Sequence, residues 1–222
     1  MPDALEKKID YTFSDPALLE TALTHSSLQG SACDNERLEF LGDRVLGLVV
    51  ADMLFSHFSG EDEGSLAKRH TGLVQQETLV RVALEIDLAS HLKLSPSEEK
   101  SGGKEKETIV ADALEALIGA VYLDGGFSAA HHFIERFWSE PLRQQTSPPE
   151  DAKSKLQEWV QAKALPLPEY TLLGKSGTDH APQFEIEVSV QGIGKTTAVA
   201  ASKRAAEKSA ALKMLEKIGI GK

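Results

Sequence analysis

The sequence predicts two domains in series, an all-α domain over residues 1–143 and a smaller α+β domain over residues 151–222, joined by a linker at residues 144–150. The first part contains apolar runs of helical length. The linker contains Pro148 and Pro149 among polar residues, a composition typical of connecting segments. From Asp151 the pattern changes: two helical segments enclose three strand-like runs, one of which alternates strictly between polar and apolar residues.

Composition limits the class of protein. The chain of 222 residues is long enough for one or two domains with substantial cores. The N-terminus is polar with charges of both signs, and no apolar run reaches the length that spans a membrane. Cys33 is the only cysteine, so an internal disulfide is excluded, and we expect a cytoplasmic protein without membrane contact.

Charge is distributed unevenly along the chain. The net charge of −10 is unusual for a protein that binds nucleic acid. Residues 1–149 hold 13 of the 24 Lys and Arg residues and 25 of the 34 Asp and Glu residues, a net charge of −12, so residues 150–222 carry +2. The acidic excess therefore belongs to the first domain, and the total charge does not exclude nucleic-acid binding by the second.

The first domain begins with two short helices. We expect one over residues 4–12, with Leu5 and Ile9 as its apolar contacts. Asp15 followed by Pro16 is a helix start, which predicts a helix over residues 17–23. His25 lies in the polar cluster that follows, and we interpret it as a capping or hydrogen-bonded histidine.

Residues 35–55 form an apolar run that predicts one helix, buried on most sides and begun by an Asp or Asn cap. At about 100° per residue, three acids fall on one narrow face of this helix: Glu36, Glu39 and Asp43. The opposite face carries Leu38, Leu41, Val45 and Val49.

Residues 108–123 also place acids inside an otherwise apolar run. Asp112 and Glu115 lie one turn apart and are the only charges in a run of small and branched apolar residues. Burying unpaired carboxylates costs free energy, and crowded carboxylates take up protons. A bound metal ion is the natural counter-charge, and ligation by carboxylates without His or Cys suits Mg²⁺ or Mn²⁺ rather than Zn²⁺.

A simpler interpretation of these acids stays open. Glu36 and Glu39 can pair with Arg37, Arg44 or other basic residues, and Asp112 can lie near a helix start. The presence of two such segments in one domain favours the metal site.

The remaining helices of the first domain are separated by polar segments. A turn at residues 59–64 precedes helices at residues 66–73 and 77–92. A polar loop at residues 95–107 leads into the second acidic helix, and residues 127–138 form the last helix of the domain.

The second domain consists of a helix at residues 151–164, strands at residues 169–174, 183–190 and 194–200, and a closing helix at residues 202–218. Lys203, Arg204 and Lys208 crowd the first turns of the closing helix, where the helix dipole favours acids. We expect phosphate groups to dock there, because the free N–H groups of a helix start also attract phosphate. Simple solvation of these three side chains is the alternative.

Two motifs carry a family resemblance. Residues 35–43, Asn-Glu-Arg-Leu-Glu-Phe-Leu-Gly-Asp, resemble the signature of ribonuclease III endonucleases, and residues 111–119, Ala-Asp-Ala-Leu-Glu-Ala-Leu-Ile-Gly, resemble their second acidic motif. The α-β-β-β-α order of residues 151–222 resembles the double-stranded RNA-binding domain. The chain thus resembles bacterial ribonuclease III, which implies an all-α ribonuclease III nuclease domain followed by a double-stranded RNA-binding domain.

This resemblance implies an endoribonuclease that hydrolyses double-stranded RNA with Mg²⁺, for which Mn²⁺ can substitute, and leaves 5′-phosphates and short 3′-overhangs. It also implies a homodimer through the nuclease domain and a role in rRNA and mRNA processing. The expected metal ligands are Glu39, Asp112 and Glu115, and Asp43 and Glu115 are the expected catalytic acids. The expected supporting or dimer-interface acids are Glu36 and Glu63.

The resemblance assigns further residues to RNA and to the dimer. Gln157 and Glu158 are expected to contact the minor groove, and His180, with Pro182, to enter a neighbouring groove from the loop between the first two strands. Lys104 and Lys106 are expected at the RNA backbone. For Phe40, packing across the dimer and packing in its own core both stay open.

Two other functions are compatible with parts of the sequence. One is a catalytically inactive protein that binds double-stranded RNA in a structural or regulatory role. The presence of all four key acids, Glu39, Asp43, Asp112 and Glu115, argues against this function. The other is a metal-dependent hydrolase of small phosphate esters, which leaves the second domain without a purpose.

Overall fold

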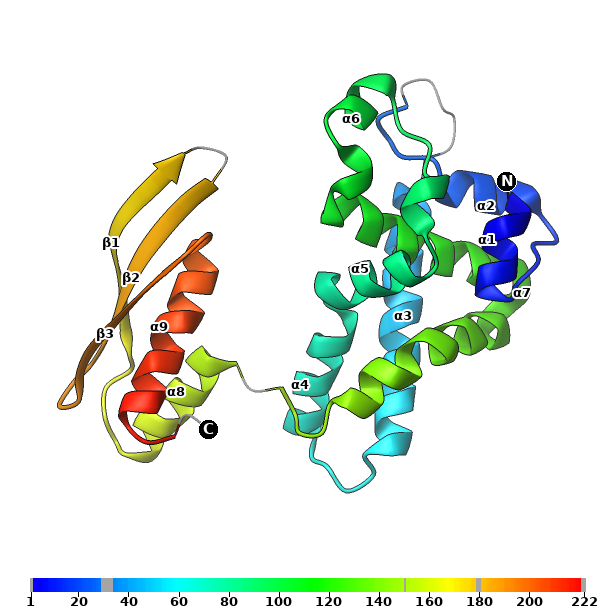
Figure 1. The fold of residues 1–222 in the computed structure, drawn as a ribbon. Helices are drawn as coiled ribbons and strands as arrows, with labels where there is room; N and C mark the ends of the chain where they lie inside the picture. Colours follow the sequence, from blue (N-terminus) through cyan, green and yellow to red (C-terminus); the bar gives the residue numbers. More distant parts are fainter. Residues whose placement is uncertain (1, 29–33, 150, 179–180, 221–222) are drawn as a thin grey trace. The chain divides into compact units, whose positions relative to one another are not determined.

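The computed structural model describes residues 2–28, 34–149, 151–178 and 181–220 (Figure 1). The chain forms two compact units, residues 1–149 and residues 150–222. Within the described residues, unit 1 is built from helices, and unit 2 has the order helix, three strands, helix. The predicted fold class is therefore confirmed.

Unit 1 begins with α1 (Pro2–Ile9) and α2 (Pro16–Ala22). Leu5 and Ile9 are buried, as predicted, but α1 ends before residue 12 because Asp10 has a φ of 55°. The predicted start of α2 is confirmed, since the Asp15 carboxylate accepts a hydrogen bond from the Ala17 N–H at 3.0 Å. His25 accepts a hydrogen bond at Nδ1 from the Ser27 N–H, 3.1 Å away, which confirms the interpretation of a hydrogen-bonded histidine.

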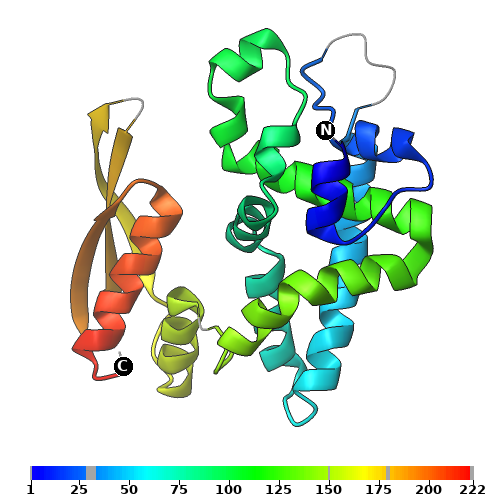
Figure 2. The ribbon, with the colours of Figure 1, turned by 45° about the vertical axis from the view of Figure 1, so that its right-hand side comes forward.

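The core of unit 1 is organised by α3 (Glu36–His57) and α7 (Glu107–Gln144). Both views show α3 crossing the two arms of the bent α7 (Figures 1 and 2). The helices predicted at residues 108–123 and 127–138 are thus two arms joined at Gly126. Its φ of 74° is accessible to glycine without a clash of a Cβ atom, and it bends the helix there.

Shorter helices complete unit 1: α4 (Glu63–Val74), α5 (Gln76–Glu85) and α6 (Pro96–Lys100), with 3₁₀ turns η1 (Leu88–His91) and η2 (Gly103–Glu105). The prediction of one helix over residues 77–92 is wrong, because Asp87 adopts a left-handed φ of 57° that an α-helix cannot include. The loop predicted at residues 95–107 contains α6, at whose start the Ser95 hydroxyl accepts a hydrogen bond from the Glu98 N–H.

Arg69 of α4 fixes the chain that follows α7. Its side chain is 2% exposed and donates from Nε and Nη2 to the two carboxylate oxygens of Glu61, at 2.7 and 2.6 Å. Nη1 donates to the carbonyl of Gln145, and the guanidinium lies 3.7 Å from the centre of the Phe58 ring. The first residue after α7 is therefore held against unit 1.

Unit 2 consists of α8 (Ala152–Ala162), β1 (Glu169–Thr178), β2 (Ala181–Val190), β3 (Gly194–Ala200) and α9 (Lys203–Lys217). The strands pair antiparallel in the order β1-β2-β3. Ile186, Val188 and Val190 are buried as the alternation predicted. The last two pack with residues of α8 and α9, which cover one face of the sheet: Leu156, Val160, Ala210 and Met214.

The first hairpin of unit 2 differs from the prediction. β1 continues past Gly174 to Thr178, because a bulge between Leu172 and Gly174 lets its pairing with β2 resume. Pro182 pairs with Gly177 inside this hairpin and does not lie in the loop. His180 lies outside the described residues.

Candidate metal centre and nucleic-acid interface

Three carboxylates converge where α3 and α7 meet. Glu39 of α3 and Asp112 and Glu115 of α7 each offer a ligand oxygen, and these oxygens lie within 4.8 Å of one another. In the described part of the chain, this is the one group of three or more Asp, Glu, His or Cys side chains close enough to hold a metal ion. The acids predicted as metal ligands from two distant segments therefore share one site.

Two glycines bring the helices together at this point. A Cβ atom on Gly42 would lie 1.7 Å from the carbonyl oxygen of Glu115, and one on Gly119 would lie 2.3 Å from the carbonyl oxygen of Leu38. The backbones of α3 and α7 thus touch at the turns that carry the acids. The sequence analysis did not single out these glycines, although a glycine inside an apolar helix indicates close packing.

The environment of the three carboxyls disfavours their charged forms. Burial, with the charges of Asp112 and Glu39 adding to it and Arg44 opposing it, raises the pKa of Glu115 to about 7. Burial also raises the pKa of Glu39, with Asp112 and Glu36 adding to the effect. Burial raises the pKa of Asp112, while His25 lowers it. Each shift has the same main cause, the loss of water around a carboxylate.

This environment fits a divalent cation. Among the described residues, none forms an ion pair with Glu39, Asp112 or Glu115, so their charge is not neutralised by a bonded side chain. Carboxylate oxygens are the ligands that hard cations such as Mg²⁺ prefer. A metal ion at this point would supply the missing counter-charge.

The other predicted acids lie outside this group. Asp43 is half-exposed and forms an ion pair with its neighbour Arg44, which the sequence suggested as a partner of Glu36 or Glu39. Glu36 is exposed, yet its charge raises the pKa of Glu39, so the two are electrostatically coupled. Glu63 lies at the start of α4, where it lines a groove with Phe55 and His70.

The basic residues assigned to the RNA backbone in unit 1 are paired with acids of α6. Lys104 lies 3.0 Å from Glu99, and Lys106 lies 2.5 Å from Glu98. Contact with a phosphate would require these lysines to exchange a carboxylate for it.

The basic cluster of unit 2 lies at the start of α9. Lys203, Arg204 and Lys208 are all exposed, and in the described chain no ion pair involves them. The first turn of α9 contains no acid, and the Ser202 hydroxyl caps the Ala205 N–H. Gln157 and Glu158 are exposed on α8. This surface can accept an anionic ligand.

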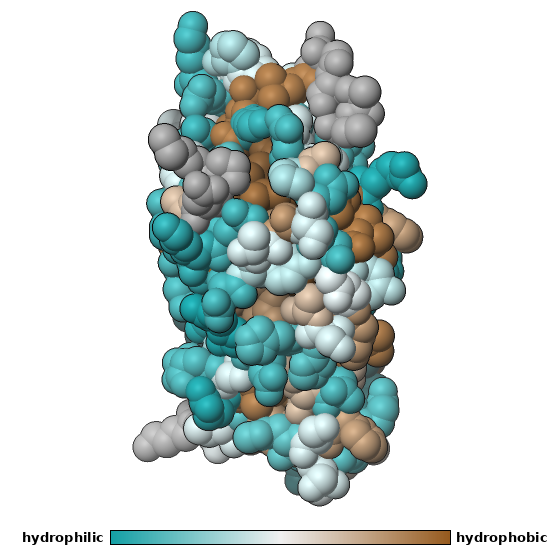
Figure 3. Space-filling model, turned by 90° about the vertical axis from the view of Figure 1, so that its right-hand side faces the viewer, coloured by the Kyte–Doolittle hydropathy of each residue, from teal (hydrophilic) through white to brown (hydrophobic). Residues whose placement is uncertain are grey.

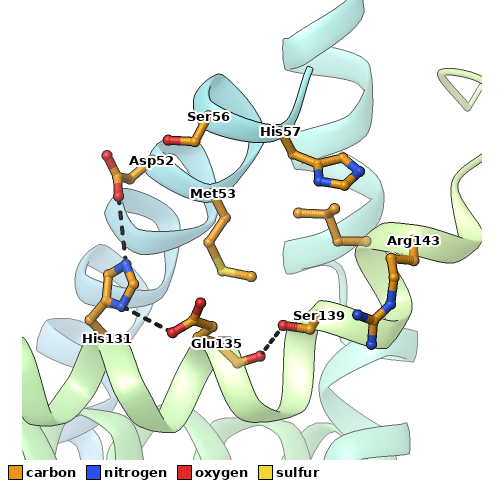
Figure 4. A pocket seen from close by; sticks show the side chains of 9 residues that line it. Asp52, Met53, Ser56, His57, His131, Glu135, Ser139 and Arg143 are labelled. Atoms are coloured by element: carbon orange, nitrogen blue, oxygen red, sulfur yellow. Dashed lines mark hydrogen bonds and ion pairs between the residues drawn. The ribbon is translucent and has the colours of Figure 1, made fainter. Parts of the chain in front are cut away.

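A polar pocket between α3 and α7 was not anticipated. His131 lies between two carboxylates, with Nε2 3.5 Å from Asp52 and Nδ1 3.8 Å from Glu135 (Figure 4). Because the two acids face opposite ring nitrogens, the three side chains do not converge on one point. The contact between His131 and Asp52 therefore links α7 to α3, and the described residues of this pocket do not form a second metal site.

Among the residues that the structure describes, no helix combines the length and apolar character needed to cross a membrane.

Comparison with known proteins gives matches over both units. A family model described as Ribonuclease-III-like matches residues 15–142, and one described as Double-stranded RNA binding motif matches residues 152–218. Ribonuclease 3 of Wolbachia sp. subsp. Drosophila simulans is 47% identical over 98% of this chain and 96% of its own. Ribonuclease 3 of Cereibacter sphaeroides is 48% identical over 97% of this chain and 94% of its own.

Solved structures agree with these matches for unit 1. A nuclease-domain structure of ribonuclease III from Campylobacter jejuni is 44% identical, with a TM-score of 0.60 over 62% of this chain and 95% of its own. A second structure of that domain is 42% identical, with a TM-score of 0.59. The helical unit that carries both acidic motifs and the RNA-binding unit after it both match these families. The chain therefore belongs to the ribonuclease III family of metal-dependent endonucleases that cleave double-stranded RNA.

Proposed function

We propose that Glu39, Asp112 and Glu115 hold Mg²⁺, with Mn²⁺ able to substitute, and that this centre cleaves each RNA strand to leave a 5′-phosphate and a short 3′-overhang. The convergence of three half-buried carboxylates, without an ion-pair partner among the described residues, supports this proposal. When bound, a divalent ion supplies a water of lowered pKa and stabilises charge on the phosphate.

The neighbouring residues orient and support this centre. Asp43 follows Glu39 by about one helical turn and is held by Arg44, so we assign to it the orientation of the attacking water. Glu115 serves as ligand and catalytic acid at the most deeply desolvated of the three carboxyls. The charge of Glu36 opposes ionisation of Glu39, so we assign Glu36 to the support of a bound cation, and Glu63, beside the exposed Phe55, to dimer contact.

A homodimer through unit 1 is the second part of the proposal. Phe40, Leu48 and Phe55 are 67%, 60% and 74% exposed on α3 and, at about 100° per residue, share one stripe. Exposure of Phe40 rules out the interpretation of an intradomain core residue. Phe40, Leu41 and Leu123 also line one hollow. Viewed from the side of the α7 bend, hydrophobic patches interrupt the hydrophilic surface (Figure 3). In the Campylobacter jejuni nuclease domain, structural flexibility is described in a region involved in dimer formation.

Unit 2 is proposed to bind the duplex through the exposed cations Lys203, Arg204 and Lys208, with Gln157 and Glu158 at the minor groove. His180 is proposed as a further contact. Residues 144–150 are proposed as the linker, shortened at its start by the bond between Arg69 and Gln145. We further propose that the protein acts in the cytoplasm on rRNA and mRNA precursors.

Glu115→Gln tests the metal assignment. We expect the variant to lose cleavage of a long RNA duplex in Mg²⁺ while retaining duplex binding in Ca²⁺. Cleavage near the wild-type rate would reject the assignment. Glu140→Gln, which removes an exposed carboxylate from the end of α7, is the matched control and should cleave normally.

A further inference from the structure

The contact between α3 and α7 is reciprocal and made by backbone atoms. Gly42 faces the carbonyl of Glu115, and Gly119 faces both the carbonyl of Leu38 and the N–H of Gly42. Each glycine therefore packs on the facing turn, and each facing turn carries a proposed ligand. Leu38 precedes Glu39 directly, and Glu115 is itself a ligand.

Not every glycine of α3 is needed for packing in this way. A Cβ atom on Gly47, five residues further along α3, would find its nearest neighbour, His70 Nε2, at 3.7 Å, an ordinary contact distance. Glycine in a helix interior is less favourable than alanine. The requirement for glycine is thus local to the crossing and absent at Gly47.

From this geometry we infer that Gly42 and Gly119 are positioning residues for the metal centre: their missing side chains set the separation of α3 and α7 at which Glu39 shares an ion with Asp112 and Glu115. This inference rests on the proposed metal site. A Cβ atom at residue 42 must move from 1.7 Å to at least 3.0 Å from the Glu115 carbonyl, a displacement of at least 1.3 Å. Because the obstacle is backbone, the helices themselves must separate.

Such a displacement acts differently on different ions. Mg²⁺ requires near-ideal octahedral ligation at about 2.0–2.1 Å, whereas Ca²⁺ accepts longer and irregular bonds at about 2.3–2.6 Å. Separation of the helices should therefore weaken Mg²⁺ binding more than Ca²⁺ binding. Loss of folded protein would weaken both equally, so the ratio of the two affinities reports spacing.

The experiment measures Mg²⁺ and Ca²⁺ affinities by isothermal titration calorimetry for the wild type, Gly42→Ala, Gly119→Ala and the control Gly47→Ala. For the first two variants we expect Mg²⁺ affinity to fall about tenfold or more, with a clearly smaller loss for Ca²⁺. Gly47→Ala should match the wild type. Circular dichroism and thermal melts establish that each variant is folded.

A compensating change sharpens the test. Asp112→Glu lengthens one ligand by a methylene, about 1.5 Å, so it should weaken Mg²⁺ binding in the wild type and partly restore it in Gly119→Ala. Unchanged Mg²⁺ affinity in folded Gly42→Ala and Gly119→Ala would overturn the inference. So would failure of both variants to fold, since the glycines would then serve the fold and not ligand spacing. Absence of Mg²⁺ binding by the wild type would instead overturn the proposed function.

Discussion

The carboxylates of Glu39 and Glu115, on different helices and far apart in the sequence, offer ligand oxygens within 4.8 Å of each other. In the part of the chain that the structure describes, neither carboxylate has an ion-pair partner. Without a metal, this arrangement opposes folding, because two desolvated like charges repel each other. This repulsion lowers the stability of the metal-free protein, and a bound cation would offset it.

Stability without metal should therefore depend on pH through Glu115. Its pKa is about 7 in the folded protein against an ordinary 4.5. Because the folded-state pKa is the higher one, the folded protein holds the proton more tightly, and stability falls as pH rises between these values. Glu115→Gln should raise the melting temperature in EDTA at about pH 8 and have little effect at about pH 4. An equal change at both pH values would contradict this explanation.

Arg69 should be a major stabilising residue of unit 1. Its guanidinium is buried, bonds Glu61 through two nitrogens and also bonds the Gln145 carbonyl. Arg69→Ala should lower the free energy of unfolding by about 3 kcal/mol, the low end for breaking a buried pair, since Glu61 stays partly hydrated. Urea denaturation measures this value. Arg143→Ala, which removes an exposed arginine paired with Glu140, should cost less than about 0.5 kcal/mol.

The basic start of α9 should contribute to duplex binding through counterion release. Lys203→Ala with Lys208→Ala should weaken binding and reduce the slope of log affinity against log salt by about two. Fluorescence anisotropy over a salt series measures both quantities. Lys195→Ala removes a lysine already paired with Glu187 at 2.7 Å and should leave the slope close to that of the wild type. A slope that does not change in the double variant would remove the proposed phosphate contacts.

Phe40 should be required for the proposed dimer. A charged residue at this exposed position would have to be buried without a partner, so Phe40→Asp should shift the protein to the monomer in sedimentation velocity. Leu84→Asp is the matched control, because Leu84 is 68% exposed on α5, outside the α3 stripe. A dimer of unchanged strength in Phe40→Asp would place the interface elsewhere.

Local signals in the chain were sufficient for much of the fold. The Asp15 cap, the alternation that ends in Val188 and Val190, and the apolar run of residues 35–55 predicted their elements because each depends on neighbours within one or two turns. Predictions failed where a single residue or a distant strand overrode such signals. Asp87 interrupts a helix by its backbone conformation, and β2 holds β1 in pairing beyond Gly174.

The candidate site also combines features that local sequence signals predict with features that only the tertiary structure decides. Residue type and spacing were enough to mark the acids of two apolar helices, because a charge in an apolar helix stands out without knowledge of its surroundings, and the family resemblance then selected Glu39, Asp112 and Glu115 as ligands. Their convergence and the backbone contact of Gly42 with Glu115 depend on how two helices cross. The crossing is a relation between segments distant in the chain, set by packing of their whole faces, and periodicity along one helix carries no information about it.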